Sequence, residues 1–151
     1  MSSENELIKL YSSRILALAT ELSAPSRLKK PDATAKKRSP LCGSAVTVDI
    51  TIENGKIADF AQDVKACALG QAAASVLGRA ALGRSLNELL TTREALQKML
   101  EFDGPAPKAP FDEMEVLRPA KDFKNRHASI MLSIEAVIEA MQKVSPKKTY
   151  A

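Results

Sequence analysis

The chain has 151 residues, a net charge of +4 and 45% hydrophobic residues, which suits one globular domain over residues 1–151. No segment approaches the roughly 20 apolar residues that a membrane span needs. The polar start is unlike a signal or transit peptide, so we expect a cytoplasmic protein. Two cysteines do not make a disulfide framework; in a reducing compartment they would be free thiols, metal ligands or buried packing residues.

The first predicted element is an amphipathic helix over residues 3–22, where apolar side chains recur every three or four positions. Ser3 and Glu6 fit a capping box at its start. The following segment, 23–40, is rich in proline and basic residues, so we expect an exposed connection with a short edge strand near Ala33–Arg38. It has no aromatic residues for base stacking, so an acidic protein partner suits it better than nucleic acid.

A β-hairpin is predicted next. Residues 46–53 alternate between apolar and polar side chains, as in a strand with one buried face. Asn54 and Gly55 are the preferred pair for a type I′ turn, and residues 56–64 form the returning strand.

Helices are expected from Cys67 onward. Residues 67–82 are rich in alanine, and Gly70 and Gly78 would mark close approaches of another backbone, because each costs about 1 kcal/mol relative to Ala in a helix interior. Two further capping-box patterns, Ser85 with Glu88 and Thr91 with Glu94, predict two short helices ending near residue 100.

The C-terminal part is expected to contain a loop, a long helix and a tail. Residues 102–111 hold one glycine and three prolines, which favours a loop. A last helix is predicted from about Pro119 to Val144, and the polar tail 145–151 is expected to fray. A helix, a small antiparallel sheet and then further helices give the α+β class, with the helices on one face of the sheet.

Three side chains with metal-binding or nucleophilic chemistry stand at the edges of these elements: Cys42 before the hairpin, Cys67 at a helix start and His127 near the start of the last helix. Helix N–H groups and the helix dipole favour a thiolate at a helix N-terminus, and neutral imidazole is a common metal ligand. The alternative is that both cysteines are small buried residues and His127 is a hydrogen-bonded core residue.

Nothing else in the sequence indicates catalysis. The glycines do not form a phosphate-binding loop, no nucleophile elbow is present, and the scattered carboxylates fit solvated faces.

Four short segments resemble the NifU N-terminal-like family of iron–sulfur cluster assembly scaffolds, which includes IscU and SufU. They are Cys42-Gly43-Ser44, Cys67 with the small residues after it, Gly83-Arg84-Ser85-Leu86, and His127-Ala128-Ser129-Ile130-Met131. The resemblance covers most of the chain. The chain departs from the family at two positions: Ala128 stands where the family has a third cysteine, and Ser44 where it has an aspartate.

The resemblance implies a three-stranded antiparallel sheet with helices on one face, an N-terminal helix and a long C-terminal helix. It implies that Cys42, Cys67 and His127 meet at one end of the molecule and hold iron or a [2Fe–2S] cluster, with zinc as a substitute. The implied partners are a cysteine desulfurase and apo-proteins that accept the cluster, with neither membrane nor nucleic acid involved. A homodimer that shares one cluster through four thiolates is a variant.

The leading hypothesis is therefore a scaffold or carrier rather than an enzyme. Three ligands leave one coordination position open, which suits a labile site. Two alternatives stay open. The loss of a thiol at Ala128 favours a degenerate scaffold paralogue that acts as a desulfurase-binding regulatory module. A zinc-bound sulfur acceptor is the other, and the missing third cysteine counts against it.

Overall fold

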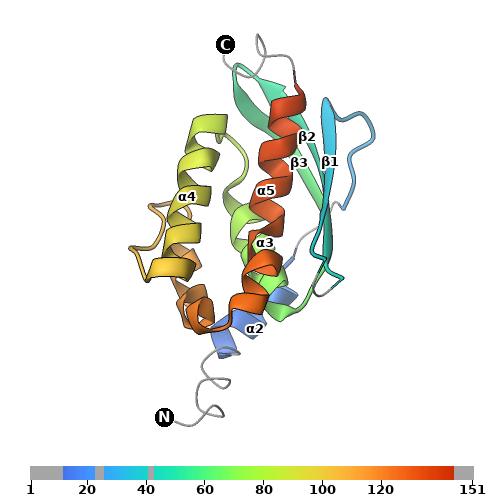
Figure 1. Ribbon diagram of the computed structural model, residues 1–151. Coiled ribbons are helices and arrows are strands. Elements are labelled where there is room, and N and C mark those ends of the chain that lie inside the picture. Colours follow the sequence, from blue (N-terminus) through green and yellow to red (C-terminus); the bar gives the residue numbers. More distant parts are fainter. Residues whose placement is uncertain (1–11, 23–25, 41–42, 145–151) are drawn as a thin grey trace.

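The computed structural model describes residues 12–22, 26–40 and 43–144 (Figure 1). Its elements in chain order are α2 (Ser13–Thr20), β1 (Ala33–Arg38), β2 (Ala45–Glu53), β3 (Lys56–Lys65), α3 (Ala68–Ala80), α4 (Leu86–Phe102), the 3-10 helices η1 (Asp112–Asp122) and η2 (Lys124–Arg126), and α5 (His127–Lys143). The predicted α+β class is confirmed. The capping box at residues 3–6, Cys42 and the tail 145–151 lie outside the described residues. Within the described part, no helix is long and apolar enough for a bilayer.

The sheet is antiparallel with strand order β1-β2-β3, as predicted. In β2, Val46, Val48, Ile50 and Ile52 are buried, because their alternation places them together on one face. Asn54 and Gly55 have φ angles of 53° and 75°, the positive values that a type I′ turn requires. The hairpin returns the chain to the end of the sheet at which β2 begins, with Ala45 opposite Lys65.

The helices cover one face of this sheet (Figure 1). Helix α5 packs against β1 and β2, α3 packs against α5 and α2, and α4 lies on the far side of α5. The apolar residues along one side of α5 are buried, including Ile130, Ile134 and Val137. The C-terminal ends of β1 and β3 and the first turn of α5 therefore lie at one end of the molecule, the lower end in Figure 1.

The predicted pair of short helices after residue 85 was wrong, because α4 is one continuous helix of 17 residues. Its capping box is formed by Ser85 and Glu88: the Ser85 Oγ accepts from the Glu88 N–H at 3.2 Å, and the Glu88 carboxylate accepts from the Ser85 N–H at 3.2 Å. The second box does not form, since no glycine or proline interrupts the helix near Thr91 and buried leucines continue beyond it.

The predicted start of the last helix at Pro119 was also wrong. The α-helix begins at His127, and residues 112–122 form η1. Its buried residues, Met114, Leu117 and Ala120, are spaced by three, which matches the three residues per turn of a 3-10 helix. Phe123, with φ −119° and ψ 72°, separates η1 from η2.

The other face of the sheet carries a buried carboxylate, which contradicts the expectation that the carboxylates lie on solvated faces. Asp49 has an exposure of 0%. Its Oδ2 accepts from Arg27 Nε at 2.6 Å and from the Leu28 N–H at 3.0 Å, and its Oδ1 accepts from Thr34 Oγ1 at 2.5 Å. Part of the basic segment is thus tied to the sheet through Asp49.

Candidate functional site

Cys67 occupies the N-cap of α3, two residues after the end of β3, and is half-buried. Its Sγ lies 3.5 Å from Ser129 Oγ in the first turn of α5. The Ser129 hydroxyl donates to Ser44 Oγ at 3.3 Å. Ser44 and Ser129 are 4% and 2% exposed, so a chain of polar atoms joins the start of β2, the start of α3 and the start of α5 away from solvent.

Gly70 makes the contact between α3 and α5 possible. A Cβ at this position would lie 2.6 Å from Ser129 Oγ and 3.1 Å from the Ser129 carbonyl oxygen, so only glycine leaves room for the approach. The predicted close backbone approach is confirmed here. At Gly78 it was wrong, because the nearest atom to an added Cβ is the side-chain Nε2 of Gln62 at 2.9 Å.

His127 is the first residue of α5, and its Nε2 lies 2.8 Å from the carbonyl oxygen of Ala120. A carbonyl oxygen only accepts, so Nε2 carries the proton in this hydrogen bond. In the neutral ring, the lone pair is then on Nδ1. Histidines that bind metals usually donate their other ring N–H to such a partner, which fixes the ring orientation.

An ion-pair network links η1, the element that contains Ala120, to the end of α4. Arg118 bonds to Glu115 at 2.6 Å and to Asp103 at 2.8 Å. The hydrogen bond from Arg118 to Asp103, with a second from Lys121, lowers the pKa of Asp103 below its ordinary value. The network fastens η1 to the end of α4, and sequence reasoning did not identify it.

Of the residues that flank Cys42, Ser44 contacts the first turn of α5, and Ser39 and Gly43 are linked to Ser44 through backbone hydrogen bonds; Cys42 itself lies outside the described residues. The Ser39 N–H donates to the Ser44 carbonyl at 2.8 Å, and the Gly43 N–H donates to the Ser39 carbonyl at 3.2 Å. These bonds close the connection between β1 and β2, and Ser44 then contacts Ser129. The structure thus joins Cys67 and Ser44 to the helix that His127 opens; a ligand role for Cys42, Cys67 and His127 stays a prediction.

A hollow of about 360 Å³ adjoins this end of the molecule. We call it the α5 hollow. It is lined by the end of β1 with Ser39 and Pro40, by the C-terminal half of α4, and by α5 from His127 and Ala128 to Glu135.

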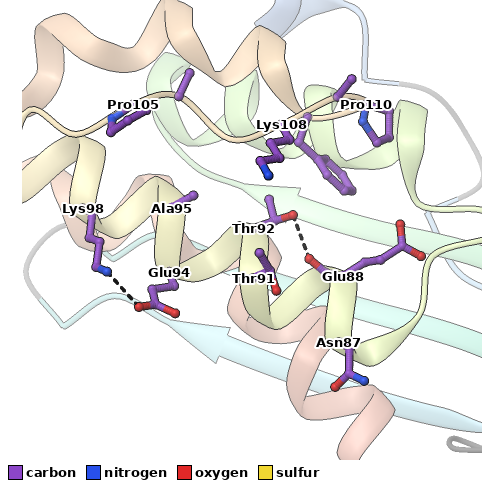
Figure 2. Close-up of a pocket in the computed structure, with 13 residues that line it drawn as sticks. Asn87, Glu88, Thr91, Thr92, Glu94, Ala95, Lys98, Pro105, Lys108 and Pro110 are labelled. Carbon is purple, nitrogen blue, oxygen red and sulfur yellow. Dashed lines mark hydrogen bonds and ion pairs between the residues drawn. The ribbon is translucent and has the colours of Figure 1, made fainter.

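A larger hollow of about 640 Å³ lies between α4 and residues 105–111 (Figure 2). Its lining includes Phe111 and Pro105, with an ion pair between Glu94 and Lys98 at 2.9 Å. It contains neither histidine nor cysteine among its lining residues. We therefore place the candidate site at Cys67 and His127.

The donor chemistry at that place suits a soft or borderline metal, because thiolate and imidazole select iron–sulfur clusters, iron and zinc. Cys67 precedes α3 and His127 opens α5, so two helix N-termini carry their partial positive charge toward this end. Over residues 12–22, 26–40 and 43–144, no three side chains of His, Cys, Asp or Glu come together as a metal-binding group. A complete ligand set therefore needs a donor beyond those residues.

The fold and this site define a small α+β protein with a thiol and an imidazole at one end of a three-stranded sheet. Residues 11–149 match the NifU-like N-terminal domain family, and the chain belongs to that family.

Relatives and solved structures agree with this membership. The chain is 23% identical over 141 residues to the iron–sulfur cluster assembly scaffold protein IscU of Thermotoga maritima, covering 90% of this chain and 95% of the relative. The IscU scaffold protein of Streptococcus pyogenes serotype M1 is 26% identical over 106 residues, covering 70% and 66%. A crystal structure of a NifU-like protein (N-terminal) from Brucella abortus superimposes with a TM-score of 0.89 at 41% identity, covering 92% and 96% of the two chains. A putative SUF-system scaffold from Fervidobacterium islandicum AW-1 shares the fold, with a TM-score of 0.79 at 17% identity over 88% and 97%.

Proposed function

We propose that this chain is an iron–sulfur cluster assembly scaffold or carrier that holds iron or a [2Fe–2S] cluster through Cys42, Cys67 and His127. One observation carries the proposal: in a chain of this family, the Cys67 sulfur lies 3.5 Å from Ser129, two residues after His127 in the first turn of α5. The IscU scaffold protein of Thermotoga maritima, 95% of which is covered by the match, supports the proposal.

The cluster is the cargo of such a protein. Cys67 and Cys42 would supply thiolates, and His127 would supply Nδ1, since its Nε2 is engaged by Ala120. A cysteine desulfurase would deliver the sulfur, apo-proteins would receive the cluster, and the work would take place in the cytoplasm. A set of three protein donors binds more reversibly than a full set of four, which suits transfer.

The test is anaerobic reconstitution with ferrous iron and sulfide, followed by visible absorption and by iron and sulfide counts. We expect a sulfur-to-iron charge-transfer spectrum in the wild type and its loss in Cys67→Ala and His127→Ala. Ser133→Ala, a buried serine one turn further along α5, is the matched control and should retain the cluster. An unchanged spectrum in Cys67→Ala would contradict the ligand assignment, and no cluster in any variant would contradict the scaffold function.

A dimeric form of the proposal has two chains sharing one cluster through the two cysteines of each. Size-exclusion chromatography before and after reconstitution distinguishes the forms, because the shared cluster doubles the mass and the unshared cluster does not.

A further inference from the structure

We propose that the α5 hollow binds a low-molecular-weight thiol with an α-amino carboxylate, and that its sulfur completes the metal coordination at the candidate site. This inference rests on the proposed function, since it names the external ligand of the same site.

The first step is the number of donors. Iron in clusters and zinc take four ligands, whereas this chain offers two cysteines and one histidine in all. The next residue along α5 from His127 is Ala128, whose methyl group cannot bind a metal. Among the described residues no carboxylate joins Cys67 and His127 as a metal-binding group, so we take the fourth ligand to come from outside the chain, either from a second copy or from a small molecule.

The second step is the location of the hollow. His127 and Ala128 both line it, together with Pro40 from the connection that holds Cys42. Its volume of about 360 Å³ falls within the usual range of small-molecule sites, roughly 300–1,000 Å³. A thiol seated there would lie beside the donor residue and beside the position that lacks one.

The third step is the charge of the lining. Arg38 and Glu135 both line the hollow, and neither forms an ion pair with any residue that the structure describes. Lys37, by contrast, already pairs with Glu139 at 3.4 Å. A free guanidinium and a free carboxylate match the carboxylate and the ammonium group of an amino acid, because each charge then gains an opposite partner.

The binding chemistry is ligand addition without oxidation or reduction. The thiol releases its proton to solvent as the sulfur binds the metal, and it takes up a proton again when it leaves. An external thiolate of this kind dissociates more readily than a ligand held by the chain, so it would leave an iron accessible for transfer.

The experiment uses the full-length protein loaded with Co²⁺, whose sulfur-to-cobalt absorption increases with each thiolate bound. Glutathione and L-cysteine are titrated separately, with 2-mercaptoethanol as the uncharged comparison. We expect either charged thiol to raise the absorption at a concentration at least about tenfold lower than 2-mercaptoethanol, equivalent to about 1.4 kcal/mol. A response to glutathione alone or to cysteine alone identifies which thiol the hollow prefers.

Two kinds of variant define the site. Arg38→Gln and Glu135→Gln should remove the advantage of the charged thiols, whereas Lys30→Gln, an exposed charge outside the hollow, should keep it. Ala128→Cys places a thiol on the wall of the hollow, so its absorption should be high without added thiol and should not respond to glutathione. Equal affinity for all three thiols, or a glutathione response unchanged in Arg38→Gln, would overturn the inference.

A metal-free measurement separates this inference from the proposed function. Amide NMR shifts of Arg38, Ala128 and Glu135 in the apo-protein should change on addition of S-methylglutathione, which has the same charges and no free thiol. If cobalt does not bind at all, the proposed ligand set is wrong. The NMR shifts then still show whether the α5 hollow binds S-methylglutathione. If cobalt binds and these shifts stay unchanged, the hollow is not the thiol site and the inference is overturned.

Discussion

The sulfur of Cys67 lies 3.5 Å from the hydroxyl oxygen of Ser129, and that hydroxyl lies 3.3 Å from the hydroxyl oxygen of Ser44. The Ser129 hydroxyl, which donates to Ser44, can accept from the Cys67 thiol, and it can turn to donate instead to a sulfur that carries negative charge. The two serines therefore form a buried polar support behind the candidate thiolate, contributed by elements far apart in the sequence.

Replacing Ser129 with alanine removes this support. We expect Ser129→Ala to lower the free energy of unfolding by about 1 kcal/mol, the usual contribution of a buried hydrogen bond. We also expect a lower reduction potential for the reconstituted cluster, because hydrogen bonds to sulfur favour the more negative, reduced form. Urea denaturation and voltammetry measure the two effects. Ser133→Ala is the control, and an equal change of potential there would show that Ser129 has no special role.

The close packing at Gly70 leads to a second prediction. Gly70→Ala should destabilise the protein by about 1–3 kcal/mol through overpacking, because the added Cβ would lie 2.6 Å from Ser129 Oγ. This loss opposes the gain of about 1 kcal/mol that alanine brings in a helix interior. Gly78→Ala in the same helix meets only the end of the Gln62 side chain, so its urea midpoint should fall less. Equal midpoints for the two variants would contradict the packing argument.

The buried carboxyl group of Asp49 should make the free energy of unfolding depend on pH in the acid range. Burial alone would raise the pKa of this carboxyl, but the hydrogen bonds from Arg27, Thr34 and the Leu28 N–H outweigh it and leave the pKa below the ordinary value of 3.8. A depressed folded-state pKa stabilises the fold above the unfolded-state pKa, and this contribution is lost as the pH falls through the folded-state value.

We therefore expect Asp49→Asn to lose about 1.5–3 kcal/mol at neutral pH, the range for a hydrogen bond to a charged group. The difference from the wild type should shrink below about pH 3.8. Urea denaturation across the acid range measures it. Asp59→Asn, an exposed carboxylate that accepts from Thr51, should change stability by less than about 0.5 kcal/mol. A difference that persisted at low pH would show that lost packing, not charge, explains the effect of Asp49→Asn.

Local sequence signals predicted the hairpin well. Alternating apolar residues and the Asn54-Gly55 pair act within a few residues of each other, so they specify both strands and the turn between them. The helix start at Ser85 was equally local. The burial of Asp49 does not follow from local signals. The alternation of apolar and polar residues places Asp49 on the outer face of the sheet, but it could not show that residues 27 and 28 cover that face.

The candidate site was harder to predict from local sequence signals. Spacing alone left Cys67 and His127 open to a packing role, and their common location was implied by the family resemblance. The contact between Cys67 and Ser129 and the bond between His127 and Ala120 depend on tertiary packing. Gly70 was the one local signal of the packing that brings Cys67 and Ser129 together. For the second, the three-residue spacing of Met114, Leu117 and Ala120 could have indicated the 3-10 helix.

Variants near the start of α4 test whether residues 86–102 form one continuous helix or two short helices. Ser85→Ala should cost about 0.5–2 kcal/mol, because its hydroxyl satisfies the Glu88 N–H at 3.2 Å. Thr91→Ala should not carry a capping penalty, since Thr91 lies inside one continuous helix and alanine has the higher helix propensity. Thermal denaturation of both variants decides between one helix and two. A comparable loss of stability in Thr91→Ala would favour a helix start at that residue.

The tautomer of His127 gives the last prediction. Since Nε2 donates to the Ala120 carbonyl at 2.8 Å, the metal should bind at Nδ1. The nitrogen-15 shifts of the ring should show Nε2 protonated and Nδ1 unprotonated in the neutral apo-protein, and zinc should move the Nδ1 signal far more than the Nε2 signal. His127→Ala should weaken zinc binding by about tenfold or more, because even the loss of a partner behind a ligand costs 10- to 100-fold. Zinc bound through Nε2 would require the bond to Ala120 to break, and that spectrum would refute the assigned geometry.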